Sequence, residues 1–165
     1  MRRPVKAAST TPRAVQARSG ARSLVSADGL APARRLDDVP APERSLLGAA
    51  GFRTFTGIAD AWALSVADRT RLLGDLAEST YHKWRSGKVG EPSRDQLERL
   101  SLVLGIYKAL RLIFTDSATG VRWLRGTNAE PTFAGRSPLA RMLDGSIDDL
   151  YAVRRYLDAW RGGWP

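Results

Sequence analysis

Helix-start signals recur along this chain, and their recurrence is the feature that most restricts its possible folds. A serine followed three residues later by an acidic or amide side chain forms a capping box, which begins a helix. The chain carries this pattern at Ser65, Ser93 and Ser146. Apolar residues recur between these points at the three- and four-residue spacing of a helix, and no segment shows the alternation of a half-buried strand. The sequence therefore predicts an all-α fold.

The first half of the ordered region is predicted to form a linker and three helices. Structure is expected to begin between Leu36 and Leu47, a stretch that Pro40 and Pro42 mark as a linker. The helical period then starts at Phe52 and ends near Leu64. A short helix after the first serine cap is stopped by Gly74, and a third helix is expected over residues 77–86.

A long apolar helical region, residues 94–114, follows the second serine cap. Its apolar residues cover more than one face, which indicates either the central helix of the fold or a subunit interface. Gly105 is expected to kink this helix or divide it in two. A break is expected over residues 116–120, then a short helix over residues 121–124.

The C-terminal part is predicted to hold two further helices. One begins at Ser137 and Pro138, a cap followed by proline at the first helical position. The last helix follows Ser146 and leaves Arg154 outside its apolar stripe. The side chains expected to point inward are Ile147, Leu150, Val153, Leu157 and Trp160.

The positive charge of the chain is concentrated before the helical region. The formal net charge is +9, and residues 1–36 alone carry +7, so residues 37–165 are almost neutral. Residues 1–36 have few large apolar side chains and are predicted to be a disordered basic tail. Three roles remain open for this tail: contact with DNA phosphates, organelle targeting, or none.

Composition excludes several classes of active site. The chain has no cysteine, which removes disulfides, thiolate metal sites and a cysteine nucleophile. It has a single histidine, His82, which removes a metal site built from several histidines. The most apolar stretch is short and interrupted by charge, so no membrane segment is expected. We expect a non-enzymatic, cytoplasmic protein without cofactor or metal.

Residues 65–88 have the layout of a helix-turn-helix: a capped short helix, a tight turn and a second short helix. Residues 79–88, STYHKWRSGK, resemble the recognition helix of phage-repressor-type (Xre-like) regulators. Tyr81 and Trp84 take the inward positions, so hydroxyl and basic side chains point outward, where they suit a DNA major groove. The alternative is a helical hairpin with a solvated charged face. The predicted DNA-binding residues are Ser79, Thr80, His82, Lys83, Arg85 and Lys88.

Four blocks in order carry a second resemblance. They are RDQLERLSLVLGIYKALRLIF at residues 94–114, WLR at 123–125, GRSPLARML at 135–143 and GSIDDLYAVRRYLDAW at 145–160. Together they resemble the C-terminal toxin-binding domain of Xre/MbcA/ParS-type antitoxins, and residues 52–88 resemble the DNA-binding domain of that family. The chain is thus expected to comprise a tail and linker (1–45), a helix-turn-helix domain (46–92) and a toxin-binding domain (93–165).

This resemblance implies a bacterial type II antitoxin that dimerises, binds operator DNA to repress its own operon and neutralises a RES-domain toxin. Such toxins act on NAD, and the C-terminal end of the antitoxin obstructs their active site. Cationic side chains suit a site that accepts a pyrophosphate, and aromatic side chains suit an interface. The alternative for these residues is a core-flanking or solvated position. The predicted toxin-binding residues are Tyr151, Arg154, Arg155, Arg161 and Trp164.

Two rival functions remain open from the sequence. One is a stand-alone helix-turn-helix regulator whose C-terminal domain only dimerises or senses a ligand. The other is an antitoxin-like subunit that no longer binds DNA.

Overall fold

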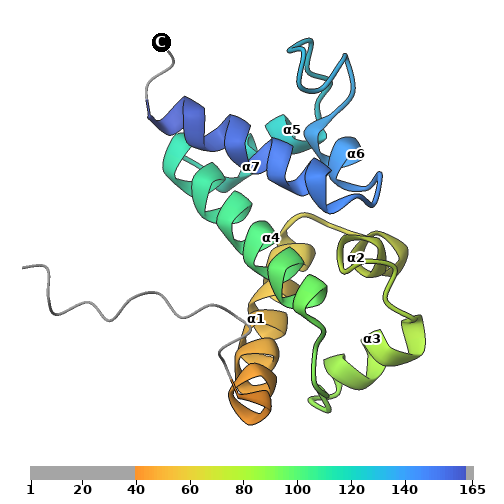
Figure 1. Cartoon of the computed structure of the whole chain (residues 1–165). Coiled ribbons are helices and arrows are strands. Elements are labelled where there is room, and N and C mark those ends of the chain that lie inside the picture. Colours follow the sequence, from red (N-terminus) through yellow and green to blue (C-terminus); the bar gives the residue numbers. More distant parts are fainter. Residues whose placement is uncertain (1–39, 163–165) are drawn as a thin grey trace, which may run out of the picture. The chain divides into compact units, whose positions relative to one another are not determined.

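A computed structural model describes residues 40–162, and these residues form helices without a strand (Figure 1). The all-α prediction is therefore confirmed. The predicted tail, residues 1–36, and Trp164 lie outside the described residues. The helices are α1 (Ala41–Ala61), α2 (Val66–Leu72), α3 (Glu78–Arg85), α4 (Arg94–Ile113), α5 (Ser117–Arg125), α6 (Pro138–Met142) and α7 (Ile147–Arg161).

Local capping explains where most of these helices begin. Ser65 and Ser93 form complete capping boxes with Asp68 and Gln96, as the sequence predicts. Ser137 accepts a hydrogen bond from the backbone N–H of Ala140 at 3.0 Å and begins α6. At the third predicted box the expectation was wrong in detail. Ser146 caps α7, but its hydroxyl accepts from the N–H of Asp148 at 3.2 Å, two residues on.

Two predicted boundaries were wrong because a helix-starting residue was read as a breaker. The prolines of residues 40–42 do not form a linker. Pro40 is the N-cap of α1 and Pro42 lies in its first turn, where the missing N–H of proline costs no hydrogen bond. Likewise, residues 116–120 are not a break. Asp116 is the N-cap of α5 and accepts the N–H of Thr119 at 2.7 Å.

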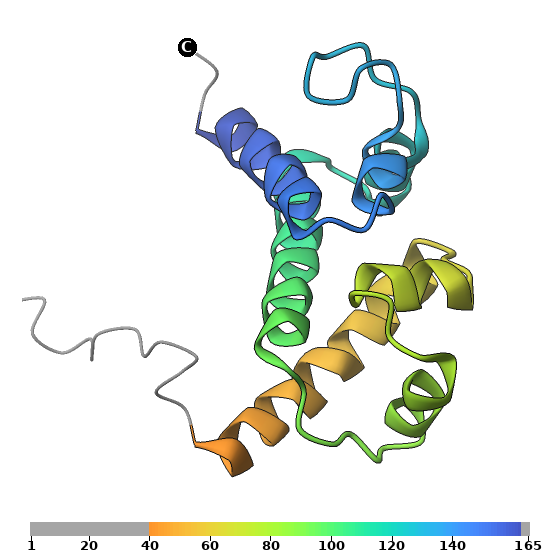
Figure 2. The same ribbon diagram turned by 45° about the vertical axis from the view of Figure 1, so that its right-hand side comes forward.

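Helix α4 lies at the centre of the described structure, packed against α1, α5 and α7 (Figure 2). Leu100, Val103, Ile106 and Leu110 are buried along its length. The wide apolar stripe predicted for this segment thus corresponds to a helix buried from several directions. The expected kink or division at Gly105 does not occur, because α4 is a single helix over Arg94–Ile113.

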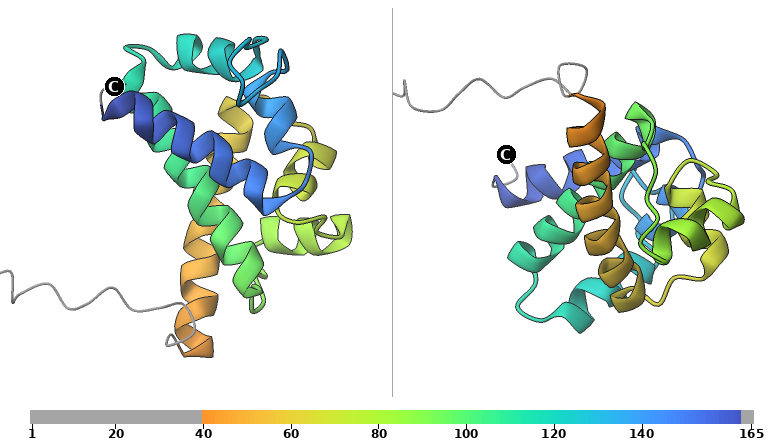
Figure 3. Two further views of the ribbon diagram at one scale, coloured as in Figure 1. Left: turned by 45° about the horizontal axis from the view of Figure 1, so that its top comes forward. Right: turned by 90° about the horizontal axis from the view of Figure 1, so that it is seen from below.

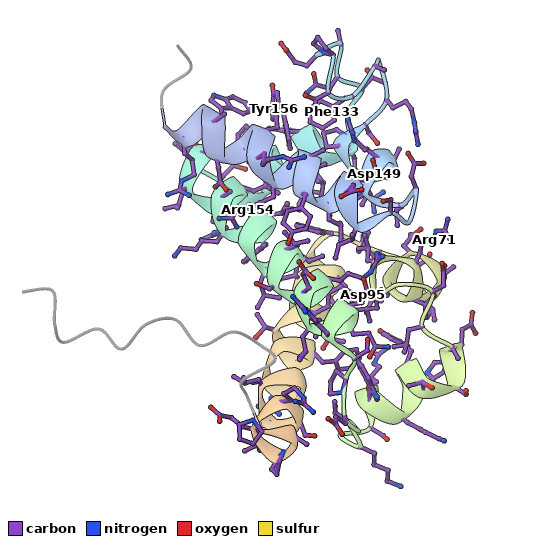
Figure 4. All side chains as sticks on the ribbon, viewed as in Figure 1. Arg71, Asp95, Phe133, Asp149, Arg154 and Tyr156 are labelled. Atoms are coloured by element: carbon purple, nitrogen blue, oxygen red, sulfur yellow. The ribbon has the colours of Figure 1, made fainter. Side chains whose placement is uncertain are left out.

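Gly105 instead makes room for a side chain of another helix. Helix α7 lies along α4 (Figure 3). Arg154 of α7 (Figure 4) reaches the position of Gly105 in α4. A β-carbon at this position would overlap the Arg154 guanidinium. Arg154 Nε also donates to Asp158 at 2.7 Å, one turn along α7. The glycine therefore allows close packing of the two helices.

Two further arginines bind the carbonyl ends of helices that lie far away in sequence. Arg125 of α5 donates to the carbonyl of Trp62 at 2.6 Å and to that of Ala63 at 2.9 Å, at the end of α1. Arg71 of α2 donates to the carbonyls of Leu143 at 3.2 Å and Asp144 at 2.7 Å, after α6. Helix C-termini leave carbonyls without partners, and a guanidinium satisfies them with favourable charge.

The contact between Gly105 and Arg154 predicts a coupled pair of substitutions. In an Arg154→Ala background, Gly105→Ala should raise the free energy of unfolding by about 0.5–1 kcal/mol, because alanine is the better helix former. In the parent chain the same substitution should give no gain or a loss, since the guanidinium must leave its place. Urea unfolding of the four variants measures this difference. An equal gain in both backgrounds would contradict the contact.

Candidate functional site

The turn between α2 and α3 has a conformation that only particular residues adopt. Gly74 has φ +81° and the following Asp75 has φ +57°, both in the left-handed region. Space is also restricted there. A β-carbon on Gly74 would lie 2.8 Å from Asp95 Oδ2 and 3.0 Å from Arg99 Nε of α4. The turn is therefore tight, and α4 packs against it.

A buried arginine fixes α2 to its neighbours. Arg69 is 8% exposed and donates from Nε to the Leu64 carbonyl at 2.9 Å. Its other nitrogens donate to the Tyr81 hydroxyl at 3.3 Å and pair with Asp60 at 2.7 Å. Burial disfavours the charged form, but these hydrogen bonds outweigh it and raise the pKa of Arg69. One guanidinium thus joins the end of α1, α2 and α3.

The inward residues of α3 are the predicted ones. Tyr81 is fully buried and Trp84 is 6% exposed. Both rings pack edge-on against Phe52 of α1, with centroids 5.7 and 5.3 Å apart. This aromatic contact fixes the rotation of α3 about its axis. The remaining faces are open: Thr80 is half-buried, and Ser79, His82, Lys83, Arg85 and Lys88 are exposed.

The exposed cations of α3 are not used in the fold. Lys83, Arg85 and Lys88 have no acidic partner among residues 40–162. Of the two acids near this surface, Asp75 is held by Arg71 through two hydrogen bonds of 2.7 and 2.8 Å, which raise the pKa of Arg71. Glu78 is exposed at the start of α3. The structure therefore places Ser79, Thr80, His82, Lys83 and Arg85 on α3 and Lys88 just after its end, with positive charge that no acidic side chain of residues 40–162 neutralises.

A second candidate surface is a cluster of five aromatic rings around the end of α7. Trp123 of α5 stacks on Tyr156 of α7, with ring centroids 6.0 Å apart and planes at 19°. Phe133 of the α5–α6 loop packs against Tyr156 at 4.9 Å (Figure 4). The Trp160 ring packs against Phe114 and Trp123, with ring centroids 5.6 and 5.9 Å apart. We call these five residues the aromatic cluster.

Trp160 is the exposed member of the aromatic cluster. It was predicted to point inward, but it is 40% exposed. The apolar period continues to residue 160, whereas α4 ends at Ile113, so the last turn of α7 has less to pack against. An indole held by neighbouring rings and partly open to solvent is a typical interface anchor.

The structure places the predicted toxin-binding residues in different surroundings. Tyr151 is half-buried and donates to Glu98 of α4, which raises the pKa of the Tyr151 hydroxyl. Arg154 is half-buried over Gly105, whereas Arg155 is exposed. Arg161 is exposed and donates to Asp158 at 3.3 Å. Trp164 lies beyond the described part of the chain.

Sequence reasoning missed the aromatic cluster as a unit. Trp123 and Phe133 are 10 residues or more from α7 in sequence, and only the fold brings them to Tyr156. The one signal in the sequence was that Trp123 and Phe133 are large aromatic residues in a short helix and a loop. Within residues 40–162 no group of acidic or histidine side chains is arranged to hold a metal ion. In the same part of the chain, none of the helices has the length and hydropathy that crossing a membrane requires.

Comparison with known proteins assigns both halves. Residues 41–105 match the model of the antitoxin Xre-like helix-turn-helix domain, and residues 109–163 match the antitoxin Xre/MbcA/ParS C-terminal toxin-binding domain. A protein of Sinorhizobium fredii (strain NBRC 101917 / NGR234), named uncharacterized protein y4oB, is 45% identical over 114 residues. The aligned part is 69% of this chain and 86% of that protein. The border between the two matched segments falls within α4.

We expect different effects from substituting a buried, hydrogen-bonded arginine near α3 and an exposed, unpaired one. Arg69→Met keeps most of the aliphatic stem but leaves the Leu64 carbonyl and the Tyr81 hydroxyl without their partner. It should lower the free energy of unfolding by about 1–3 kcal/mol. Arg85→Met removes an exposed, unpaired cation and should change it by less than about 0.5 kcal/mol. Urea unfolding followed by tryptophan fluorescence makes the comparison. Similar effects from both would show that Arg69 is not a structural residue.

Proposed function

The chain belongs to the Xre/MbcA/ParS-type antitoxins, and from this we propose that it neutralises a RES-domain toxin and represses its own operon. Its DNA-binding and toxin-binding domains are the two parts that such an antitoxin needs. We assign it no catalytic step. The identity of the toxin class rests on the family resemblance, and the roles of individual residues rest on the two surfaces described above.

For operator binding we propose that α3 enters the major groove of DNA. Ser79 and Thr80 lie in its first turn, where hydroxyls can reach base edges or phosphates. His82, Lys83, Arg85 and Lys88 follow, and the lysines and Arg85 can neutralise phosphates without breaking any ion pair of the fold. The support for this proposal is that every predicted contact residue of α3 lies away from the Tyr81 and Trp84 side.

For toxin binding we propose the aromatic cluster and the cations around α7. The observation that carries this proposal is the position of Trp160, which lies within the segment matched by the toxin-binding domain. Its ring packs against Phe114 and Trp123 and is still 40% exposed to solvent. Arg155 and Arg161 lie on the same helix and suit a toxin site that accepts the pyrophosphate of NAD. We assign Tyr151 and Arg154 mainly to the contact between α7 and α4, where they meet Glu98 and Gly105. Trp164 is proposed as a further anchor.

We also propose that the chain acts as a homodimer in the bacterial cytoplasm, within a larger toxin–antitoxin complex. A dimer of a helix-turn-helix protein reads two half-sites of an operator. Support comes from Leu46, Leu47 and Leu112, which are exposed in the single chain although large and apolar. Sedimentation of the isolated chain measures its association state.

Co-expression in bacteria tests the proposed function. The product of the neighbouring open reading frame should arrest growth and deplete NAD when expressed alone, and this chain should restore both. A version lacking residues 161–165 should still bind DNA but fail to rescue. If the neighbour is harmless, or the full chain does not rescue growth, the toxin assignment is wrong. In that case the stand-alone regulator is the better reading.

Substitution of Trp160 examines the toxin surface itself. Trp160→Ala should weaken binding to the toxin by about 2 kcal/mol or more, roughly 30-fold in Kd, because buried tryptophans are frequent interface hot spots. Lys83→Ala is the control, since Lys83 is exposed and lies outside the segment matched by the toxin-binding domain. Titration calorimetry with purified toxin measures both. Equal affinity for the parent chain and Trp160→Ala would remove Trp160 from the interface.

A further inference from the structure

A small hollow lies beside α3 and includes Arg85, one of the residues already assigned to operator binding. Its volume is about 140 Å³, and it is lined by α1, by the end of α3 and by the segment that follows α3. Phe52 and Trp84 form its base, two buried rings packed edge-on at 5.3 Å. Arg53 of α1 and Arg85 of α3 line it as well. Arginines from two different helices thus line one concavity.

These two arginines are available for a ligand. Both are exposed, and neither has an acidic partner among the described residues. No acidic side chain lines the hollow. Several other arginines within residues 40–162 differ in this respect, because Arg69, Arg71, Arg99, Arg136 and Arg154 are each bound to a carboxylate. Unneutralised positive charge at a concave surface attracts an anion.

Arg53 is joined rigidly to the helix that we assign to the major groove. It directly follows Phe52, whose ring contacts both Tyr81 and Trp84 of α3. The position of Arg53 is therefore fixed relative to α3. A cation on a neighbouring helix, held at a constant distance from the recognition helix, can bind the sugar–phosphate backbone and so set the register of the protein on DNA.

We propose that this hollow is a seat for one backbone phosphate of duplex DNA, held jointly by Arg53 and Arg85. The proposal rests on the proposed binding of DNA through α3 and adds α1 to the interface. Guanidinium groups bind phosphate oxygens with paired, charge-assisted hydrogen bonds. The ligand is a phosphodiester, which is the same at every sequence, so this seat adds affinity and orientation but no choice of bases.

The dependence of DNA binding on salt tests the seat. The probes are a duplex from the region upstream of the chain's own gene and a duplex of unrelated sequence, each titrated at several salt concentrations. Arg53→Ala should weaken binding to both duplexes by the same factor and reduce the slope of log K against log salt by about 1. Arg53→Lys should keep the slope, because a lysine still neutralises the phosphate.

Two control variants separate failure of the seat from failure of the proposed function. Arg122→Ala removes an exposed arginine of α5, in the toxin-binding half, and should change neither affinity nor slope. Lys83→Ala should weaken DNA binding if α3 is the helix that enters the major groove.

If Lys83→Ala weakens DNA binding and Arg53→Ala does not, the proposed phosphate seat is wrong while DNA binding through α3 stands. Weaker binding of Arg53→Ala to the upstream duplex alone, with an unchanged slope, also overturns the seat, since it indicates base reading. If the parent chain binds neither duplex, both proposals fail.

Discussion

Helix α4 packs against α1, α5 and α7, and both candidate surfaces depend on this packing. Its first half supports the helix-turn-helix, where Asp95 and Arg99 lie against Gly74 in the turn before α3. Its second half supports α7 and, through Phe114, the aromatic cluster. The border between the two matched family segments lies inside this same helix. The DNA-binding and toxin-binding domains therefore share part of one apolar core and are not joined by a linker.

Arginine has two separate uses in this chain, and net charge alone does not distinguish them. Several arginines bind carboxylates or helix-end carbonyls within the fold, as Arg71 and Arg125 do between sequence-distant helices. Others, such as Arg53, Arg85 and Arg155, are exposed without an acidic partner in the described residues. Because the region after residue 36 is almost neutral overall, its capacity to bind an anion depends on this partition. Among the cations without an acidic partner in residues 40–162, Lys83, Arg85 and Lys88 lie on or just after α3, and Arg53 lies on the neighbouring α1.

Local signals were sufficient to predict much of this fold. A capping serine and a stop glycine act within one helical turn, so α2, α3, α4 and α6 could be predicted from a few neighbouring residues. The start of α1 was missed because proline has the same local appearance at a helix start and in a linker. The role of Gly105 could not be predicted, since it depends on Arg154 of another helix. The same limit applies to the candidate sites. The outward residues of α3 follow from a single helical period, whereas Arg53 and the aromatic cluster require the tertiary packing.

If one cooperative unit carries both candidate surfaces, its parts unfold together, and native-state hydrogen exchange measures this directly. The amides of Leu72 and Leu73 report on the helix-turn-helix, and those of Val153 and Leu157 report on α7, all of them in the buried core. We predict the same free energy of opening for the two groups, equal to the free energy of global unfolding. If α7 opened at a clearly lower free energy while the helix-turn-helix stayed protected, the two surfaces would lie on separate units and the shared role of α4 would be contradicted.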